Sequence, residues 1–185
     1  MQRDLVLRAR AGDHDAFTAL INGAIDRLYS VARLIVRDND RARDAVQDAL
    51  LRAWTGLPGL RDPDRFDAWL HRLLVHACYR AARQERSRRI VEIQMDVNVD
   101  VASRDTPGGL ALRDQLERGF LRLSPDQRAV LVLRYYLDLT DTAAAEALSI
   151  PVGTLKSRLN RATRALRAAL QANERAPELT TESIA

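Results

Sequence analysis

Residues 149–172 read SIPVGTLKSRLNRATRALRAALQA, and this stretch decides how the C-terminal part of the chain folds. The proline and glycine near its start predict a tight turn, and the spacing of the apolar residues after them predicts a long helix that ends near Ala172. One narrow face of that helix, placed at about 100° per residue, is apolar and should pack inward: Leu155, Leu159, Ala162 and Leu166. Upstream, Thr140 is a candidate cap for a short helix ending near Leu148. A short helix, a tight turn and a long helix together predict a helix-turn-helix.

The opposite face of the long helix is basic and polar. No Asp or Glu lies between Glu146 and Glu174. The residues concerned are Ser157, Asn160, Arg161 and Arg164, with Lys156, Arg167 and Arg158 on the flanks. In the DNA major groove, Arg or Lys can pair with guanine edges and Asn with adenine, while flanking positive charge meets phosphates. We interpret this face as a DNA-reading surface; the alternative is a solvated basic face on an ordinary bundle helix.

Apolar residues recur at helical spacing through the rest of the chain as well. Stripes run through residues 17–35, 42–54 and 66–77 in the N-terminal half, and through 110–123 and 125–136 in the C-terminal half. From residue 90 to 101 apolar and polar residues alternate, but no partner strand is visible, so we expect an extended linker there. The sequence therefore predicts an all-α protein of two small helical domains at 1–89 and 110–172, a linker at 90–109 and a polar tail at 173–185.

The composition limits the class of protein. The 185 residues are 46% hydrophobic, and no apolar run approaches the roughly 18–20 residues of a membrane-spanning helix. The N-terminus lacks the apolar core of a signal peptide, so we expect a cytoplasmic protein without membrane insertion. A net charge of +4 is too small by itself to indicate nucleic acid, and the position of the positive charge matters more.

The sequence offers little support for an enzyme. His71 and His76 are five residues apart, not the four of a His-Glu-x-x-His zinc motif. The single cysteine, Cys78, excludes an internal disulfide and a cysteine-based metal cluster, and it should pack as a small core thiol. There is no glycine-rich phosphate loop. We therefore predict no catalytic residue, no metal and no cofactor.

Two further faces, both in the N-terminal half, carry opposite chemistry. Four residues point outward together when the stripe at 42–54 faces inward: Asp44, Gln47, Asp48 and Leu51. A leucine among carboxylates on an exposed face indicates a protein partner, although a single exposed leucine is common. A basic cluster that begins with Arg80 and Arg83 follows the aromatic residues Phe66 and Trp69 and would suit a single nucleic-acid strand. By their spacing, Phe66 and Trp69 also fit simple core positions.

Two stretches give the sequence a resemblance to the extracytoplasmic-function (ECF, group IV) sigma factors of the sigma-70 family, the small two-domain initiation subunits of bacterial RNA polymerase. DAVQDALLRAW at 44–54 looks like that family's polymerase-binding helix, and IPVGTLKSRLNRA at 150–162 looks like its −35-recognition helix-turn-helix. Phe66-x-x-Trp69-Leu70 and Leu123-Ser-Pro-Asp-Gln127 stand between them in the family order. The resemblance covers about residues 4–89 and 110–170.

The resemblance implies a role for each surface. Residues that match the contacts to the β′ clamp helices are Asp44, Gln47, Asp48 and Leu51. The loop at 56–65 matches the segment that captures a flipped-out base of the −10 element, and the implied −10 contacts are Leu60, Arg61, His76, Arg80 and Arg83. The implied −35 contacts are Thr154, Lys156, Ser157, Arg158, Asn160, Arg161 and Arg164. The linker, with Asp96, Asp100 and Asp105, would thread the polymerase toward the RNA exit channel.

The implied function is promoter-specific initiation without catalysis by this chain: the C-terminal helix fixes position on the duplex, and the N-terminal domain stabilises the opened −10 strand. The implied partners are core RNA polymerase, through its β′ clamp helices and β flap, promoter DNA and an anti-sigma factor. We expect the free protein to bind promoter DNA poorly, because the linker leaves the two domains unaligned. The alternative, a stand-alone helix-turn-helix regulator that binds operator DNA as a dimer, leaves the outward acidic face unexplained.

The sequence departs from the family pattern at several positions. His76 stands where the family usually has asparagine, and Arg80 where it often has aspartate. Asp141-Thr142-Ala143 replaces the usual Glu-Ile signature of the first helix of the helix-turn-helix. Its turn glycine is replaced by Ser149, and a left-handed backbone at that serine would cost on the order of 1 kcal/mol.

Overall fold

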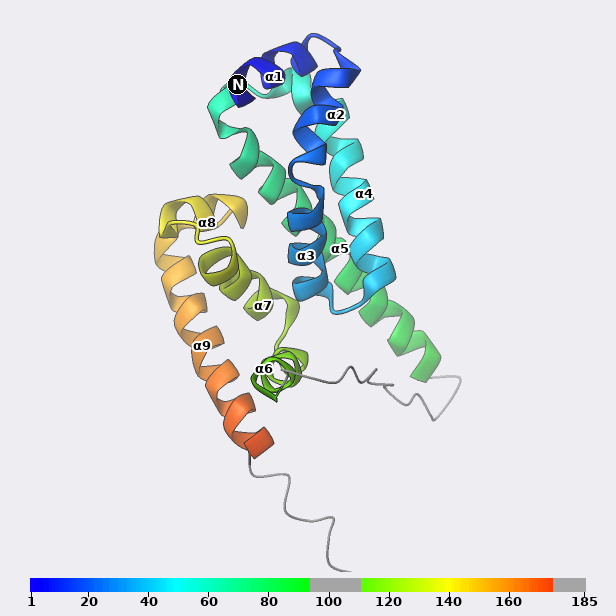
Figure 1. Ribbon diagram of the computed structural model, residues 1–185. Coiled ribbons are helices and arrows are strands. Elements are labelled where there is room, and N and C mark those ends of the chain that lie inside the picture. Colours follow the sequence, from blue (N-terminus) through cyan, green and yellow to red (C-terminus); the bar gives the residue numbers. More distant parts are fainter. Residues whose placement is uncertain (94–110, 175–185) are drawn as a thin grey trace, which may run out of the picture.

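A computed structural model describes residues 1–93 and 111–174 of the chain, and every regular element in these ranges is helical (Figure 1). The N-terminal domain contains α1 (Gln2–Arg10), α2 (His14–Asn22), α3 (Ile25–Val36), α4 (Asn39–Gly56) and α5 (Phe66–Ile93), with 3₁₀ turns at Leu57–Gly59 and Pro63–Arg65. The C-terminal domain contains α6 (Ala111–Leu121), α7 (Pro125–Leu131), a π-helical turn (Val132–Tyr136), α8 (Asp141–Ala147) and α9 (Val152–Glu174). The predicted all-α fold with two helical domains is confirmed. Across these ranges, no helix combines the length and apolar character needed to cross a membrane.

Side-chain caps mark the starts of two N-terminal helices, α2 and α4. The carboxylates of Asp13 and Asp38 accept hydrogen bonds from backbone N–H groups three residues onward, at the starts of α2 and α4. The single apolar stripe predicted over 17–35 is in fact two helices, because α2 ends before Gly23 and α3 begins at Ile25. Helix α1, which the apolar pattern did not predict, precedes them.

In the C-terminal domain the local signals act as predicted. Ser124 and Gln127 form a capping box: the Ser124 hydroxyl accepts from the Gln127 N–H at 3.2 Å, and the Gln127 side chain accepts from the Ser124 N–H at 2.9 Å. Thr140 caps α8 through its hydroxyl. The following turn passes through Ser149, whose φ of 55° is left-handed, so the expected cost of about 1 kcal/mol applies. Helix α8, this turn and α9 form the helix-turn-helix.

Helix α5 is longer than predicted. It continues to Ile93, so the prediction of a linker beginning at residue 90 is wrong. The run at 83–92 is rich in arginine, glutamine and glutamate, which favour helix, and contains no proline or glycine that would end it. The rest of the predicted linker, including Asp96, Asp100 and Asp105, lies outside the described residues, as does the tail beyond Glu174.

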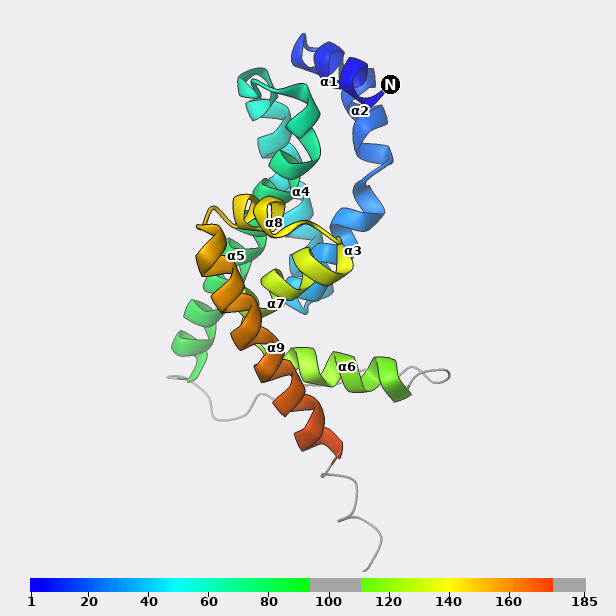
Figure 2. The ribbon, with the colours of Figure 1, turned by 90° about the vertical axis from the view of Figure 1, so that its left-hand side faces the viewer.

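The two domains pack directly against each other. Helix α7 lies against α3 and α8 lies against α5, while α9 lies on the outer side of the helix-turn-helix domain (Figures 1 and 2). The buried apolar residues of both domains form one continuous cluster that includes Phe66 and Leu74 of the first and Leu133 and Leu155 of the second. Among the described residues, Arg128 of α7 is the charged residue that this packing buries, with 7% of its surface exposed.

Candidate polymerase and nucleic-acid interfaces

Helix α9 carries the predicted DNA-reading residues on its outer face. Leu155 and Ala162 are fully buried and hold the helix against the rest of its domain. The exposed residues on the outer side are Lys156, Ser157, Asn160, Arg161 and Arg164. The predicted orientation of this helix is therefore confirmed, whereas contact with DNA stays a prediction.

Weak surface contacts hold some of these side chains. The Ser157 hydroxyl donates to the Thr154 carbonyl at 2.9 Å, and Arg161 Nε donates to the Ser157 carbonyl at 3.4 Å. Lys156 Nζ lies 4.0 Å from a carboxylate oxygen of Asp141 in α8. Because exposed pairs of this kind contribute about 0–1 kcal/mol, a phosphate or a base edge can replace them at small cost.

Arg158 and Thr154 occupy a different position from the other predicted −35 contacts. Both are half-buried. Arg158 borders a polar recess of about 330 Å³ between α9 and the start of α7, which is also lined by Ser124, Asp126, Gln127 and Arg161. Arg158 therefore lies at the inner edge of the basic face, beside the cap of α7.

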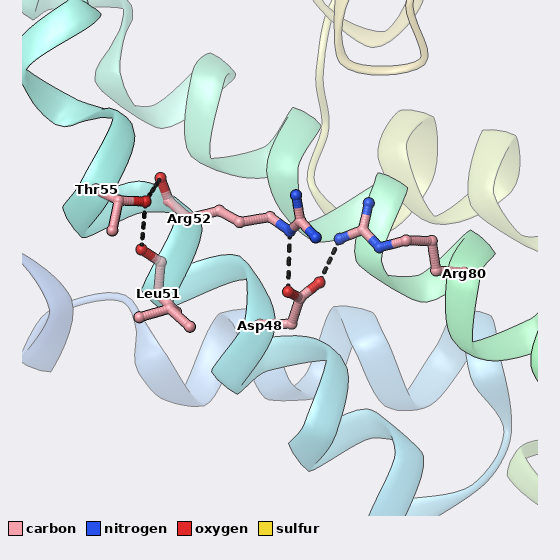
Figure 3. A network of polar contacts seen from close by, with 5 residues as sticks. All are labelled: Asp48, Leu51, Arg52, Thr55 and Arg80. Carbon is pink, nitrogen blue, oxygen red and sulfur yellow. Dashed lines mark hydrogen bonds and ion pairs between the residues drawn. The ribbon is translucent and has the colours of Figure 1, made fainter.

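Helix α4 carries the outward acidic face. Three of its four predicted residues are exposed: Asp44, Gln47 and Leu51, the last at 63%. Asp48 is half-buried, and two arginines share its carboxylate (Figure 3). Arg52 Nε donates to Oδ1 at 2.9 Å, and Arg80 of α5 donates to Oδ2. The second of these bonds joins α4 to α5.

The arginine pair determines the charge of Asp48. Burial raises the pKa of this carboxyl, but the hydrogen bonds from Arg80 and Arg52 outweigh burial, and the pKa lies below its ordinary value. The carboxylate is consequently ionised at neutral pH. Two residues predicted for different interfaces, Asp48 for polymerase and Arg80 for DNA, thus bind each other, although 32 positions separate them.

An apolar groove that the sequence did not reveal lies beside the acidic face. It has a volume of about 520 Å³ between α3 and α4, and its lining includes Ile25, Tyr29, Val46, Gln47 and Leu50. Ile25 falls in the apolar stripe at 17–35, yet it is 40% exposed. Gly23 is the sequence signal that could have shown a new helix beginning near Ile25. That new helix need not keep Ile25 on the buried face of the one before it.

The predicted −10 contacts do not form a single open surface. Arg61 and Arg83 are exposed. Leu60 is only 8% exposed and belongs to the core, so in this conformation its side chain is not open to DNA, and its −10 contact stays a prediction. Burying an aliphatic side chain of this size is favourable by about 1.5–3 kcal/mol, which explains its position.

His76 contacts the helix-turn-helix domain. It is half-buried on α5, and its Nε2 lies 3.3 Å from the hydroxyl of Ser149 in the turn before α9. Burial, and to a smaller extent the charges of Arg72 and Arg80, lower the pKa of His76. A neutral imidazole therefore faces the turn at pH 7.

The aromatic residues Phe66 and Trp69 and the single cysteine pack in the interior of the N-terminal domain. Phe66 is buried, and its ring centroid lies 6.1 Å from that of the half-buried Trp69, which agrees with the core interpretation of these aromatics. Cys78 is fully buried, and burial raises the pKa of its thiol to about 12, so it is a poor nucleophile. Within the described ranges, no three His, Cys, Asp or Glu side chains gather in a way that could hold a metal ion.

A second apolar groove crosses the contact between the domains. It has a volume of about 460 Å³, and its lining includes Leu34 of α3, Leu116 and Phe120 of α6, Tyr135 and Tyr136 of the π-helical turn, and Leu166 of α9. Tyr135 is 64% exposed, and Tyr136 and Leu116 are also exposed. An exposed group of aromatic and aliphatic side chains is typical of protein-binding surfaces.

Each of the two domains matches a known protein-family model. Residues 20–88 match the family model for sigma-70 region 2, and residues 113–166 match that for sigma-70 region 4. Among solved structures, the chain is similar to CnrH in its complex with the cytosolic domain of CnrY, with a TM-score of 0.67, 26% identity and coverage of 93% of this chain and 98% of the other. It is also similar to RpoE of Bartonella quintana in complex with the anti-sigma factor NepR, with a TM-score of 0.68, 26% identity and coverage of 85% and 98%.

Relatives match over most of the chain. The ECF RNA polymerase sigma factor SigM of Mycobacterium tuberculosis is 34% identical over 152 residues, which span 82% of this chain and 76% of the relative. The RNA polymerase sigma-H factor of Pseudomonas aeruginosa is 30% identical over 180 residues, which span 91% and 93%. ECF RNA polymerase sigma factor SigW of Bacillus subtilis is 25% identical over 182 residues, which span 92% and 97%. With both regions present in order and relatives at this identity, the chain belongs to the ECF sigma factors of the sigma-70 family.

Proposed function

We propose that this sigma factor binds core RNA polymerase through α4, reads the −35 duplex through α9 and holds the opened −10 strand on the N-terminal domain. The observation that carries the proposal is the presence of two exposed faces of opposite charge on different domains. Asp44 and Gln47 point outward on α4, and Lys156 and Arg161 point outward on α9. The chain supplies binding and positioning, and catalysis belongs to the polymerase, with which it would act in the cytoplasm.

The proposed polymerase contact is the acidic face together with the groove beside it. Asp44 and Gln47 offer polar groups to the β′ clamp helices, and Leu51 is an exposed apolar side chain at the centre of the same face. An interface of this kind combines an apolar anchor with a polar rim. Asp48 contributes negative charge, but its carboxylate is already shared between Arg52 and Arg80.

The proposed −35 contact is the outer face of α9 in the major groove. Lys156, Asn160 and Arg161 are the candidates for base edges, and each is exposed. Arg164, one turn further along the helix, and Arg158 at its inner edge are the candidates for phosphates. Ser157 and Thr154 lie between these groups.

The proposed −10 contact is formed by the loop at 56–65 and the face of α5 that follows it. Arg61 and Arg83 supply exposed positive charge for the strand backbone. Arg80 is a candidate only when its bond to Asp48 opens. A neutral His76 can donate or accept a hydrogen bond toward an unpaired base.

Two further protein partners follow from the family. The groove lined by Leu116, Tyr135 and Tyr136 is the candidate surface for the β flap of the polymerase, because it exposes aromatic and aliphatic side chains on the helix-turn-helix domain. An anti-sigma factor is a proposed regulator, since the similar structures of CnrH and RpoE were solved with the cytosolic domain of CnrY and with the anti-sigma factor NepR.

Run-off transcription with core polymerase on a randomised promoter library tests the proposal. We expect transcripts from promoters with enriched −35 and −10 sequences, and a weak gel shift of the same promoters by the free chain. The double variant K156A/R161A should lose the −35 preference while retaining core binding, and R122A, which removes an exposed arginine of the same domain, should retain both. Tight, sequence-specific binding by the free chain without any response to core polymerase would instead support the stand-alone regulator.

A further inference from the structure

One carboxylate of the acidic face is bonded from two helices. Asp48 of α4 accepts hydrogen bonds from Arg52 of the same helix and from Arg80 of α5, and Figure 3 shows both guanidinium groups converging on it. The two arginines outnumber the carboxylate that they share. While both bonds are closed, a basic partner therefore meets little net negative charge at Asp48, and Asp44 carries the exposed negative charge of this face.

The bond between Asp48 and Arg80 can open without separating the two helices. The Asp48 and Arg80 side chains are 37% and 40% exposed, so a partner can reach either end of the bond. Helices α4 and α5 also pack over buried apolar residues, and a second ion pair joins Arg41 of α4 to Glu85 of α5. An ion pair as exposed as Asp48–Arg80 contributes at most a factor of about five to an equilibrium constant.

The two ends of this bond are proposed contacts for different partners. Asp48 belongs to the proposed polymerase face, and Arg80 belongs to the proposed −10 face. A basic group of the polymerase competes with Arg80 for the carboxylate, and a DNA phosphate competes with Asp48 for the guanidinium. Each partner alone must therefore weaken the same bond. The partner that binds second finds the bond already open, so each partner improves the binding of the other.

We propose that the Asp48–Arg80 bond couples polymerase binding to capture of the −10 strand: polymerase takes the carboxylate and thereby releases Arg80 for a phosphate of the opened strand. This inference rests on the proposed function, because it takes α4 as the polymerase face and α5 as the −10 face. The coupling is reciprocal, and the strength of the bond limits it to about two- to fivefold. An aspartate, which the family often has at position 80, would repel Asp48, so the coupling depends on the arginine of this chain.

A purely structural bond predicts a different result when Arg80 is removed. If Arg80 only held the Asp48 carboxylate in place, its loss would leave polymerase binding weaker or unchanged. If Arg80 competes with the polymerase, its loss frees the carboxylate, and polymerase binding becomes tighter. The same loss removes a contact to the opened strand, so promoter opening by the assembled holoenzyme falls. Opposite changes in one variant therefore distinguish competition from bracing.

Two measurements on the full chain test the proposal. Equilibrium titration of R80Q with core polymerase, without DNA, should show binding about two- to fivefold tighter than that of the wild type. Permanganate footprinting of R80Q holoenzyme at saturating sigma factor should show promoter opening reduced by about the same factor. Arg80→Met, which keeps an apolar stem of similar length, should give the same two changes.

Two further variants are the controls. The gain in core binding should be absent when D48N/R80Q is compared with D48N, because the gain requires the Asp48 carboxylate. Arg72→Gln removes the same charge from a half-buried position about two turns earlier on α5, and it should change neither core binding nor promoter opening.

The outcomes separate the inference from the proposed function. Core binding by R80Q and R80M that is weaker or unchanged, or a gain that persists without Asp48 or appears in R72Q, would overturn the inference and leave the sigma-factor function intact. Unchanged promoter opening by the R80Q holoenzyme would overturn it as well. A wild-type chain that neither binds core polymerase nor opens a promoter would overturn the proposed function itself. Tighter core binding that depends on Asp48, together with reduced opening, supports both.

Discussion

Replacing Arg128 by methionine should destabilise the protein by about 2–4 kcal/mol, because one side chain satisfies backbone carbonyls from both domains. Its Nε donates to the Ile35 carbonyl at 2.6 Å, and its Nη1 donates to the carbonyls of Leu123 at 2.6 Å and Phe120 at 3.4 Å. Ile35 lies in the last turn of α3 and Phe120 in the last turn of α6, where carbonyls lack partners within their own helix. Methionine retains an apolar stem of similar length and offers no donor.

The magnitude follows from two opposing contributions. A hydrogen bond from a charged group contributes about 1.5–3 kcal/mol, so the two bonds at 2.6 Å together contribute on the order of 3–6 kcal/mol. Against this, burial, with a smaller effect from Arg37, lowers the pKa of Arg128 to about 10, which shows that the site disfavours the charge. Removing the buried cation returns part of that cost, and the net loss is about 2–4 kcal/mol.

Urea denaturation of the full chain, followed by circular dichroism, measures this difference in the free energy of unfolding. Arg122→Met is the matched control, since it removes an exposed arginine of the same domain and should change stability by no more than about 0.5 kcal/mol. The stability of Arg128→Lys should lie between those of the wild type and R128M, because a single ammonium cannot donate in the several directions that the guanidinium does. If R128M unfolds within about 0.5 kcal/mol of the wild type, the reasoning about shared carbonyls is refuted.

Three further outcomes are expected. In urea unfolding, Ser149→Gly should be about 0.5–1 kcal/mol more stable than Ser149→Ala. Both variants lose the hydroxyl near His76, but only glycine removes the backbone strain at a φ of 55°. Equal stabilities of the two variants would contradict this. Burial lowers the pKa of both His71 and His76, so their contribution to the free energy of unfolding is full above pH 6.5 and is lost as the pH falls through their folded pKa values. The double variant H71Q/H76Q should not show this loss. A wild type whose stability does not fall in this pH range would contradict the burial argument. Arg161→Ala should weaken holoenzyme binding to the −35 duplex by about 1–3 kcal/mol in footprinting, whereas a uniform loss across all sequences would identify a phosphate contact instead.

The sequence predicts the elements whose signals are local. The amphipathic pattern of α9, the capping box at Ser124 and the threonine cap of α8 depend on residues within one or two turns, and each is present in the structure. The family's turn glycine stands at the position of Ser149, and the backbone there is left-handed. Errors occur where a boundary lacks a strong stop signal, as at the C-terminal end of α5, which continues to Ile93.

What the sequence could not predict is non-local. Arg128 follows a capping box on a short helix, and nothing in its neighbours indicates that it bonds to Ile35, 93 positions away. Likewise, Leu60 is an implied −10 contact, yet it packs in the core. The periodicity of one helix identifies its buried face, but two helices of different domains have no common register from which their pairing could be deduced.

The exposed acidic face of α4 provides the most direct test of the account. Core polymerase binding to the charge-reversal variants D44R and D44R/D48R should be measured by equilibrium titration; D44R leaves the Asp48–Arg80 bond in place. Asp40→Arg is the matched control, because it reverses an exposed charge on the same helix. Asp40 lies in the first turn of α4, where a positive charge opposes the helix dipole, so this control should destabilise α4 more than D44R does. We predict that D44R weakens assembly about tenfold or more and D44R/D48R weakens it further, with run-off transcription falling in parallel and D40R close to wild type. Unchanged assembly and initiation by D44R/D48R would contradict the claim that this sigma factor meets its polymerase through α4.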